Sequence, residues 1–110
     1  MIKAVITRDL SGSIKSLRIN GHSGYAEAGQ DIICSAVSVS AYTAAGALGD
    51  LAGLAGCYIE DDGEIVISLP QDMTEQQRAT AGIILETTAI GLKQIELSYG
   101  KYVFVIEEEV

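Results

Sequence analysis

Residues 32 to 49 form the longest uncharged run in the chain, and they read Ile-Ile-Cys-Ser-Ala-Val-Ser-Val-Ser-Ala-Tyr-Thr-Ala-Ala-Gly-Ala-Leu-Gly. Apolar and small residues recur at intervals of three or four in and beyond this run, at Ile33, Val37, Ala41, Ala44, Leu48, Leu51 and Ala55. This is the period of an α-helix. Eighteen residues reach the lower length limit of a membrane span. Serine, threonine, tyrosine and glycine dilute the run, so we predict a helix buried within the protein and no membrane partner.

The start of this helix holds a candidate nucleophile. Asp31 is predicted as the N-cap, because its carboxylate can accept hydrogen bonds from the unpaired N–H groups of a first helical turn. Cys34 then lies at about the third helical position. Gly46, Gly49 and Gly53 lower the helix propensity, and we expect close packing against another element to explain them.

Two strands are predicted before the helix. Alternating apolar residues indicate one strand around residues 2–7 and another around residues 14–19, with a turn at residues 9–13 between them. The second strand ends at Asn20 and Gly21. His22 is therefore expected at the mouth of a loop rich in small residues, a position that suits function.

Three strands and a second helix are predicted in the second half of the chain. Residues 57–60 and 64–69 are predicted strands around the turn signal Asp61-Asp62-Gly63. Thr74 and Gln77 match a capping box that opens a second helix ending near Ser98. A last strand is expected at residues 101–107, and the acidic residues 107–109 are interpreted as a solvated end.

The predicted order is ββαββαβ. It favours the α+β class, with two helices packed on one face of a largely antiparallel five-stranded sheet. No linker, repeat or low-complexity segment divides the chain, so we expect one domain over residues 1–110, long enough to bury a core.

Composition narrows the class of protein. Two cysteines in 110 residues do not make the dense disulfide framework of a small secreted protein, so a cytoplasmic location is expected. The formal net charge of −8 and the seven scattered Lys and Arg residues disfavour nucleic-acid binding. The acidity suits a basic partner, and it equally suits a protein that only needs to stay soluble.

His22 and Cys34 form the candidate catalytic pair. They are twelve positions apart across a glycine-bearing loop, and they are the only histidine and one of the two cysteines of the chain. The positive end of a helix dipole and a nearby imidazole both favour a thiolate over a thiol. This is the chemistry of a cysteine hydrolase, with His22 protonating the leaving amine. Backbone N–H groups of residues 33–35 are expected to stabilise the oxyanion.

The stretch from Gly21 to Ser38 closely resembles the Prp family of ribosomal-processing cysteine proteases. The pattern is Gly-His, then an aromatic residue and a glycine, then Asp, two aliphatic residues, Cys and a run of small residues. The chain supplies it at Gly21, His22, Tyr25, Gly29, Asp31, Ile32, Ile33, Cys34, Ser35, Ala36, Val37 and Ser38. The resemblance implies an endopeptidase that removes a short N-terminal extension from large-subunit ribosomal protein twenty-seven. It also implies a homodimer, no cofactor, and catalytic roles for His22 and Cys34.

Neighbouring residues have open alternatives. Asp31 either caps the helix or turns toward His22 and fixes its tautomer. Ser38, one turn after Cys34, either lines the pocket or allows packing. The loop with Ser23, Gly24, Tyr25 and Gly29 either orders over substrate or is an ordinary surface loop, and Tyr25 either contacts substrate or anchors the loop.

Two further interpretations concern metal and function. Cys57 is expected to pack as a small apolar residue. A zinc site from His22, Asp31, Cys34 and Cys57 is conceivable by ligand type, but it lacks the closely spaced ligand pairs of structural sites, so no metal is expected. The alternatives to a protease are a non-catalytic acidic module that binds a basic ribosomal protein and a small thiol hydrolase that acts on thioesters.

Overall fold

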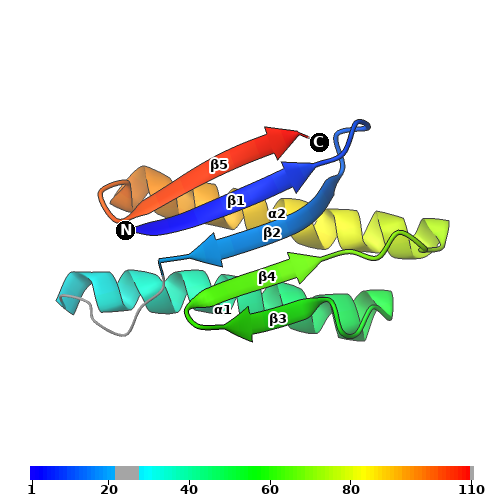
Figure 1. Cartoon of the computed structure of the whole chain (residues 1–110), viewed down its shortest axis with the longest axis horizontal. Coiled ribbons are helices and arrows are strands. Elements are labelled where there is room, and N and C mark those ends of the chain that lie inside the picture. The colour runs from blue at the N-terminus through cyan, green and yellow to red at the C-terminus, as the bar shows by residue number, and fades with distance from the viewer. Residues whose placement is uncertain (22–27, 110) are drawn as a thin grey trace.

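The structure is a computed structural model that describes residues 1–21 and 28–109, with the backbone alone for residues 28–31. Its elements in chain order are β1 (Ile2–Arg8), β2 (Ile14–Asn20), α1 (Ala28–Ala52), β3 (Tyr58–Asp61), β4 (Glu64–Ser68), α2 (Glu75–Tyr99) and β5 (Val103–Glu109). The five strands form one sheet in the order β3-β4-β2-β1-β5. Both helices cover the same face of this sheet and run side by side in opposite directions (Figure 1). The predicted α+β class and element order are confirmed.

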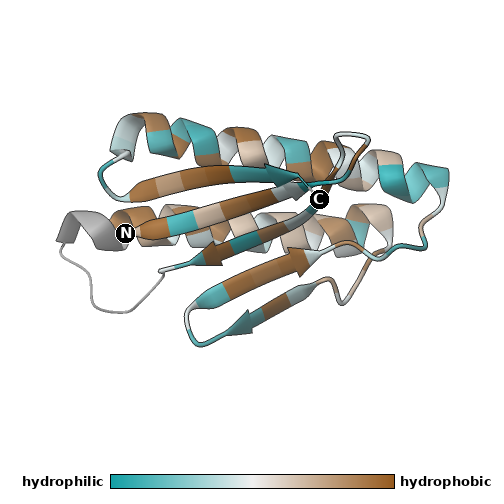
Figure 2. Cartoon of the chain, turned by 45° about the horizontal axis from the view of Figure 1, so that its top comes forward, coloured by the Kyte–Doolittle hydropathy of each residue, from teal (hydrophilic) through white to brown (hydrophobic). Residues whose placement is uncertain are grey.

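The sheet is antiparallel except at one edge. β1 pairs with β2, β2 with β4, and β3 with β4, all antiparallel, whereas β5 runs parallel to β1 with Ile2 opposite Val103. Alternate residues of β1 are buried, which places one side of the strand against the helices. Hydrophobic residues are concentrated in the strands, as the brown segments of Figure 2 show. The core lies between the layers and includes the fully buried Ile6, Ile19 and Leu48.

Local signals that the sequence carries are found in the structure. The β1–β2 turn is closed by Asp9, whose Oδ1 accepts hydrogen bonds from the backbone N–H of Ser11 and Ser13 at 2.9 and 3.1 Å. Thr74 and Gln77 form the predicted capping box, in which each side chain accepts from the other residue's backbone N–H. These motifs were predictable because each involves residues close in sequence.

Several boundaries differ from the prediction. α1 begins at Ala28, so Asp31 lies inside the helix and is not its N-cap. Alanine and glutamine favour helix more than aspartate does, but Gly29 lies between them and disfavours it, so intrinsic propensity does not explain the earlier start. At the other end the helix stops at Ala52, where Gly53 has φ +68, and Leu51 is 71% exposed. The predicted apolar stripe is therefore wrong in its last turn.

One other expectation is wrong, and another is confirmed only in part. A Cβ placed at Gly46 or Gly49 would have no neighbour within 4 Å, so no close packing against the described residues explains these glycines. The acidic residues 107–109 are exposed, as expected for a solvated end, but they belong to β5, which pairs along its whole length with β1. The Glu107 carboxylate forms ion pairs with Arg8 and Lys93 at 2.9 and 3.2 Å. Backbone pairing therefore carries the strand beyond its apolar residues.

α1 also meets the length and composition of a membrane span over Ile32–Ala52. Its buried residues pack against α2 and the sheet, as expected for a core helix.

Candidate active site

The end of β2 fixes where the chain leaves the sheet, at Gly21, one residue before His22. Gly21 follows Asn20, the last residue of β2, and has φ +83, a left-handed conformation that glycine adopts without strain. A Cβ at this position would collide with the main-chain carbonyl oxygen of Met1. Glycine is therefore needed at position 21 for two reasons. Its positive φ is unfavourable for other residues, and any side chain would collide with the backbone of Met1. His22 itself lies outside the described residues.

Cys34 lies on the buried side of α1. It is the seventh residue of the helix and is 7% exposed, with Ile33 at 4% and Val37 at 0% as its buried neighbours. Both cysteines carry reduced thiols. The start of α1 and the end of β2 lie at the same end of the molecule in both views (Figures 1 and 2).

The position of Cys34 changes two expectations. It lies in the second turn of α1, so the prediction of a first-turn cysteine is wrong. The backbone N–H groups of residues 33–35 are inside the helix and donate to carbonyl groups four residues earlier. They are therefore committed to the helix and are not the oxyanion donors that the sequence suggested. The dipole of α1 also acts less strongly beyond its first turn.

Ser38 is a polar residue on the buried face of α1, four residues after Cys34. Its Oγ donates a hydrogen bond of 2.7 Å to the backbone carbonyl oxygen of Cys34, and it is only 7% exposed. This contact ties the hydroxyl to the residue that carries the thiol, one helical turn away. Ser35 is exposed on the other side of the helix.

The structure describes other predicted site residues only in part or not at all. Ser23, Gly24 and Tyr25 belong to residues 22–27, which the structure does not describe. Gly29 and Asp31 are described only as backbone within α1. The two interpretations that remain for Asp31, an orienting role toward His22 and a place in a zinc site, thus fall outside the described side chains.

An acidic hollow beside Gly21 was not foreseen from the sequence. It has a volume of about 400 Å³, and its lining includes Gly21 together with Asp61, Asp62 and Glu64 of the β3–β4 turn. The register explains this neighbourhood, because Ile19 of β2 lies opposite Ile65 of β4. Residues 61–63 carried a turn signal, but nothing in the sequence indicated which strand end lies next to that turn.

Cys57 lies apart from these residues, just before β3. It is half-buried, and burial raises the pKa of its thiol. Its backbone carbonyl accepts a hydrogen bond from the N–H of Ser68 at 3.0 Å. This agrees with the packing role that the sequence suggested.

The chain is similar to known proteins over nearly its whole length. A family model of cysteine proteases matches residues 1–104, which defines the chain as an enzyme of the cysteine protease class. The family is described as cysteine protease Prp, and the chain belongs to it.

Individual relatives agree with this assignment. The chain is 32% identical over 101 residues to the ribosomal processing cysteine protease Prp of Bacillus subtilis, with 90% of each chain covered. It is similar to the crystal structure of SMU.848 from Streptococcus mutans, with a TM-score of 0.88, 26% identity, and coverage of 100% of this chain and 99% of that one. The fold is also that of Prp from S. aureus solved with a substrate peptide, with a TM-score of 0.85, 24% identity, and coverage of 98% and 100%.

Proposed function

We propose that this chain is a cytoplasmic endopeptidase that removes an N-terminal extension from large-subunit ribosomal protein twenty-seven. The observation that carries the proposal is the family match over residues 1–104, supported by a curated relative named as a ribosomal processing protease. Cys34 is the nucleophile, and His22 is the general base and acid.

In the proposed reaction the Cys34 thiolate attacks the carbonyl carbon of the scissile peptide bond. The C–N bond breaks, and His22 gives its proton to the leaving amine. Water then hydrolyses the thioester and regenerates the thiol. Oxyanion donors come from outside residues 33–35, because those N–H groups serve the helix. Ser38 holds the backbone of the nucleophile through its 2.7 Å hydrogen bond.

The test is incubation with a peptide that spans the extension junction, with cleavage read by mass spectrometry. Cys34→Ala should abolish cleavage and keep the fold, whereas the matched variant Cys57→Ala should cleave normally. His22→Ala should lower kcat far more than it raises KM. Substantial cleavage by Cys34→Ala would contradict the mechanism. Turnover of small thioesters without any peptide cleavage would favour the thiol hydrolase, and peptide binding without either activity would favour the binding module.

A basic substrate suits the acidic hollow beside Gly21. Ribosomal proteins are basic as a class, and Asp61, Asp62 and Glu64 line a hollow that begins one residue before His22. We expect these carboxylates to attract Lys and Arg side chains of the substrate, an effect that weakens as salt screens it.

Charge at the hollow can be tested with a matched pair of variants. Asp61→Asn with Asp62→Asn should raise KM several-fold and weaken its dependence on salt. Glu108→Gln with Glu109→Gln removes the same charge from β5, at the far edge of the sheet, and should leave KM close to the wild-type value. Equal effects of the two double variants on KM would mean that the net charge of the protein, and not the hollow, attracts the substrate.

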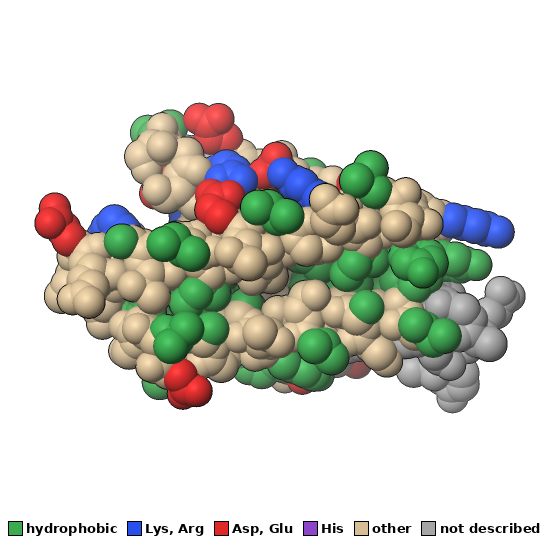
Figure 3. Space-filling model, turned by 180° about the vertical axis from the view of Figure 1, so that it is seen from behind, with side chains coloured by type: hydrophobic (Ala, Val, Ile, Leu, Met, Phe, Trp, Pro, Cys, Tyr) green, Lys and Arg blue, Asp and Glu red, His purple; other side chains and the backbone are tan. Residues whose placement is uncertain are grey.

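A homodimer is the expected assembly, and the outer face of the two helices is the surface that we propose for it. α1 carries no charged residue from Ile32 to Gly49. The most exposed positions of α2 after Arg78 are also uncharged, namely Ala79, Ile83, Thr87, Ile90, Gln94, Leu97, Ser98 and Tyr99. The partly exposed Glu86 and Lys93, by contrast, form ion pairs with Arg8 and Glu107. Hydrophobic side chains are spread over both helices on this face (Figure 3). In a chain with a net charge of −8, such a face lets two copies approach without repulsion across the contact.

Light scattering coupled to size-exclusion chromatography tests this assembly. Ile90→Glu on α2, where the side chain is 60% exposed, should convert a dimer into a monomer. Ile59→Glu, at a 64% exposed position on β3, is the control and should leave the dimer intact. A monomeric wild-type protein, or dissociation by Ile59→Glu alone, would contradict the proposed face.

A further inference from the structure

A second hollow lies at the opposite end of the molecule from the start of α1. It is formed by the β1–β2 turn, the end of β4 and the start of α2 (Figure 1). Its volume is about 480 Å³, which lies within the range of small-molecule sites. The protease chemistry proposed above makes no use of this end.

The floor of the hollow is apolar and fixed. Ile14, only 3% exposed, belongs to the core, and the half-buried Leu69 and Met73 pack against that core. A backbone hydrogen bond of 3.0 Å from Leu69 N–H to the carbonyl of Lys15 holds the two walls together. The floor therefore offers a ligand an apolar surface that does not have to be assembled on binding.

The rim carries two cations. Lys15 and Arg78 both line the hollow, and neither forms an ion pair with a carboxylate among the described side chains. Within the described part of the chain, the Arg78 side chain makes one long hydrogen bond, from Nη2 to the carbonyl oxygen of Gln71 at 3.4 Å. Lys3 and Lys101 also form no ion pair among the described side chains, but Lys15 and Arg78 lie together on the rim of one hollow.

The rim also holds one carboxylate, that of Asp9. Its Oδ1 already accepts three hydrogen bonds within the β1–β2 turn, from Ser11 N–H, Ser11 Oγ and Ser13 N–H. Arg78 contributes to lowering the pKa of this carboxyl, after the hydrogen bonds of Ser11 and Ser13. Two cations and one carboxylate leave a single net positive charge, which matches a monoanion better than a phosphate dianion.

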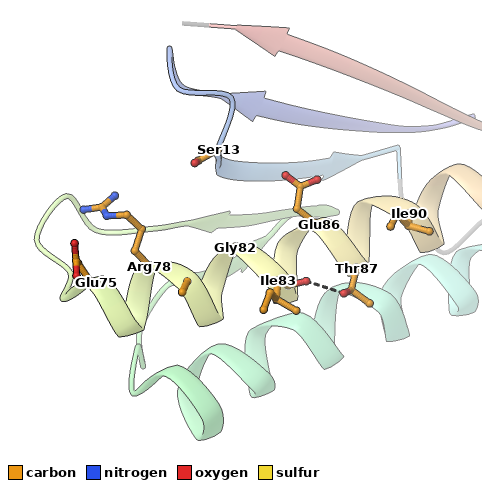
Figure 4. Close-up of a pocket in the computed structure, with 9 residues that line it drawn as sticks. Ser13, Glu75, Arg78, Gly82, Ile83, Glu86, Thr87 and Ile90 are labelled. Atoms are coloured by element: carbon orange, nitrogen blue, oxygen red, sulfur yellow. Dashed lines mark hydrogen bonds between the residues drawn. The ribbon is translucent and has the colours of Figure 1, made fainter.

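We propose that this hollow binds a small amphiphilic carboxylate, with its carboxylate between Lys15 and Arg78 and its apolar body on the floor. Gly82 of α2 lines this hollow and also the open groove beside it, which Figure 4 shows together with Ser13 and Arg78. A Cβ at Gly82 would have no neighbour within 4 Å, so space is available there for the ligand.

The probe for the test is sodium octanoate, followed through the amide resonances of ¹⁵N-labelled protein. Saturable shifts are expected at Ile14, Leu69 and Gly82. Octylammonium, which has the same alkyl group and the opposite charge, should cause no saturable shift at these residues.

Variants separate the pocket from general charge effects. Lys15→Gln with Arg78→Gln should weaken octanoate binding at least tenfold, whereas Lys3→Gln with Lys101→Gln, which removes two exposed cations elsewhere, should leave it unchanged. Gly82→Leu keeps both cations and fills the hollow, so it should also weaken binding at least tenfold. The proposal is overturned by unsaturable shifts, by equal binding of octylammonium, or by equal losses in the two charge variants.

Discussion

Gly21 offers a sharp test of how the strand end before His22 is built. Alanine at this position must adopt φ +83, which costs about 1 kcal/mol relative to glycine. Its Cβ also meets the carbonyl oxygen of Met1, so the first residues of the chain must move or Gly21 must leave its conformation. Strain of this kind adds about 1–2 kcal/mol. We expect Gly21→Ala to lower the free energy of unfolding by about 2–3 kcal/mol and Tm by roughly 10 °C.

Gly12 provides the matched control for this measurement. Its φ is +89, but a Cβ there would have no neighbour within 4 Å. Gly12→Ala should therefore lose only the conformational part, about 1 kcal/mol, in urea unfolding followed by circular dichroism. The difference between the two variants isolates the contact with Met1. Equal losses, or no loss in Gly21→Ala, would refute the collision and with it the account of how the chain leaves β2 at Gly21.

The remaining predictions concern charge, thiols and capping. The hydrogen bond from Arg8 lowers the pKa of Glu86 below its ordinary value of 4.5, so this pair stabilises the fold above that pH and the contribution is lost as the pH falls below it. Arg8→Gln should therefore flatten the dependence of Tm on pH between 5 and 3, and an unchanged slope would exclude this pair as a source of acid sensitivity. Iodoacetamide at pH 7 should alkylate Cys34 before Cys57, although Cys34 is the more buried thiol. The reason is that the proposed imidazole activates Cys34, whereas burial raises the pKa of Cys57. Faster alkylation of Cys57 would mean that Cys34 is not activated. Thr74→Ala should cost about 1 kcal/mol in urea unfolding through loss of the capping box, and a neutral result would show that this cap adds nothing to stability.

The sequence predicted what depends on neighbouring residues. The β1–β2 turn and the capping box each follow from short motifs, and the helical period located the buried residues Val37 and Leu48. The resemblance to the Prp family rested on a compact stretch, and it is confirmed by the family match. Local patterns suffice in these cases because the interacting groups are a few residues apart.

The features that escaped prediction depend on partners far away in the sequence. The parallel pairing of β5 with β1 places Glu107 in a strand, which its sequence did not indicate, while the residue stays exposed as its charge predicted. The β2–β4 register brings Gly21 beside the turn at Asp61, which neither segment indicates by itself. The start of α1 was misplaced for another reason. The N-cap preference of aspartate is only a local signal, and the helix begins at Ala28 although Gly29 disfavours helix.

The pairing of β1 with β5 also governs when this protein can fold during its own synthesis. Ile2 lies opposite Val103, so the sheet closes around a chain segment of about a hundred residues. Until residues 103–109 have been translated, β1 has β2 on one side and a row of unpaired backbone N–H and C=O groups on the other. A nascent chain stalled before β5 would therefore expose an aggregation-prone strand edge. Messages truncated in this region should yield aggregation and proteolysis rather than a smaller active protease.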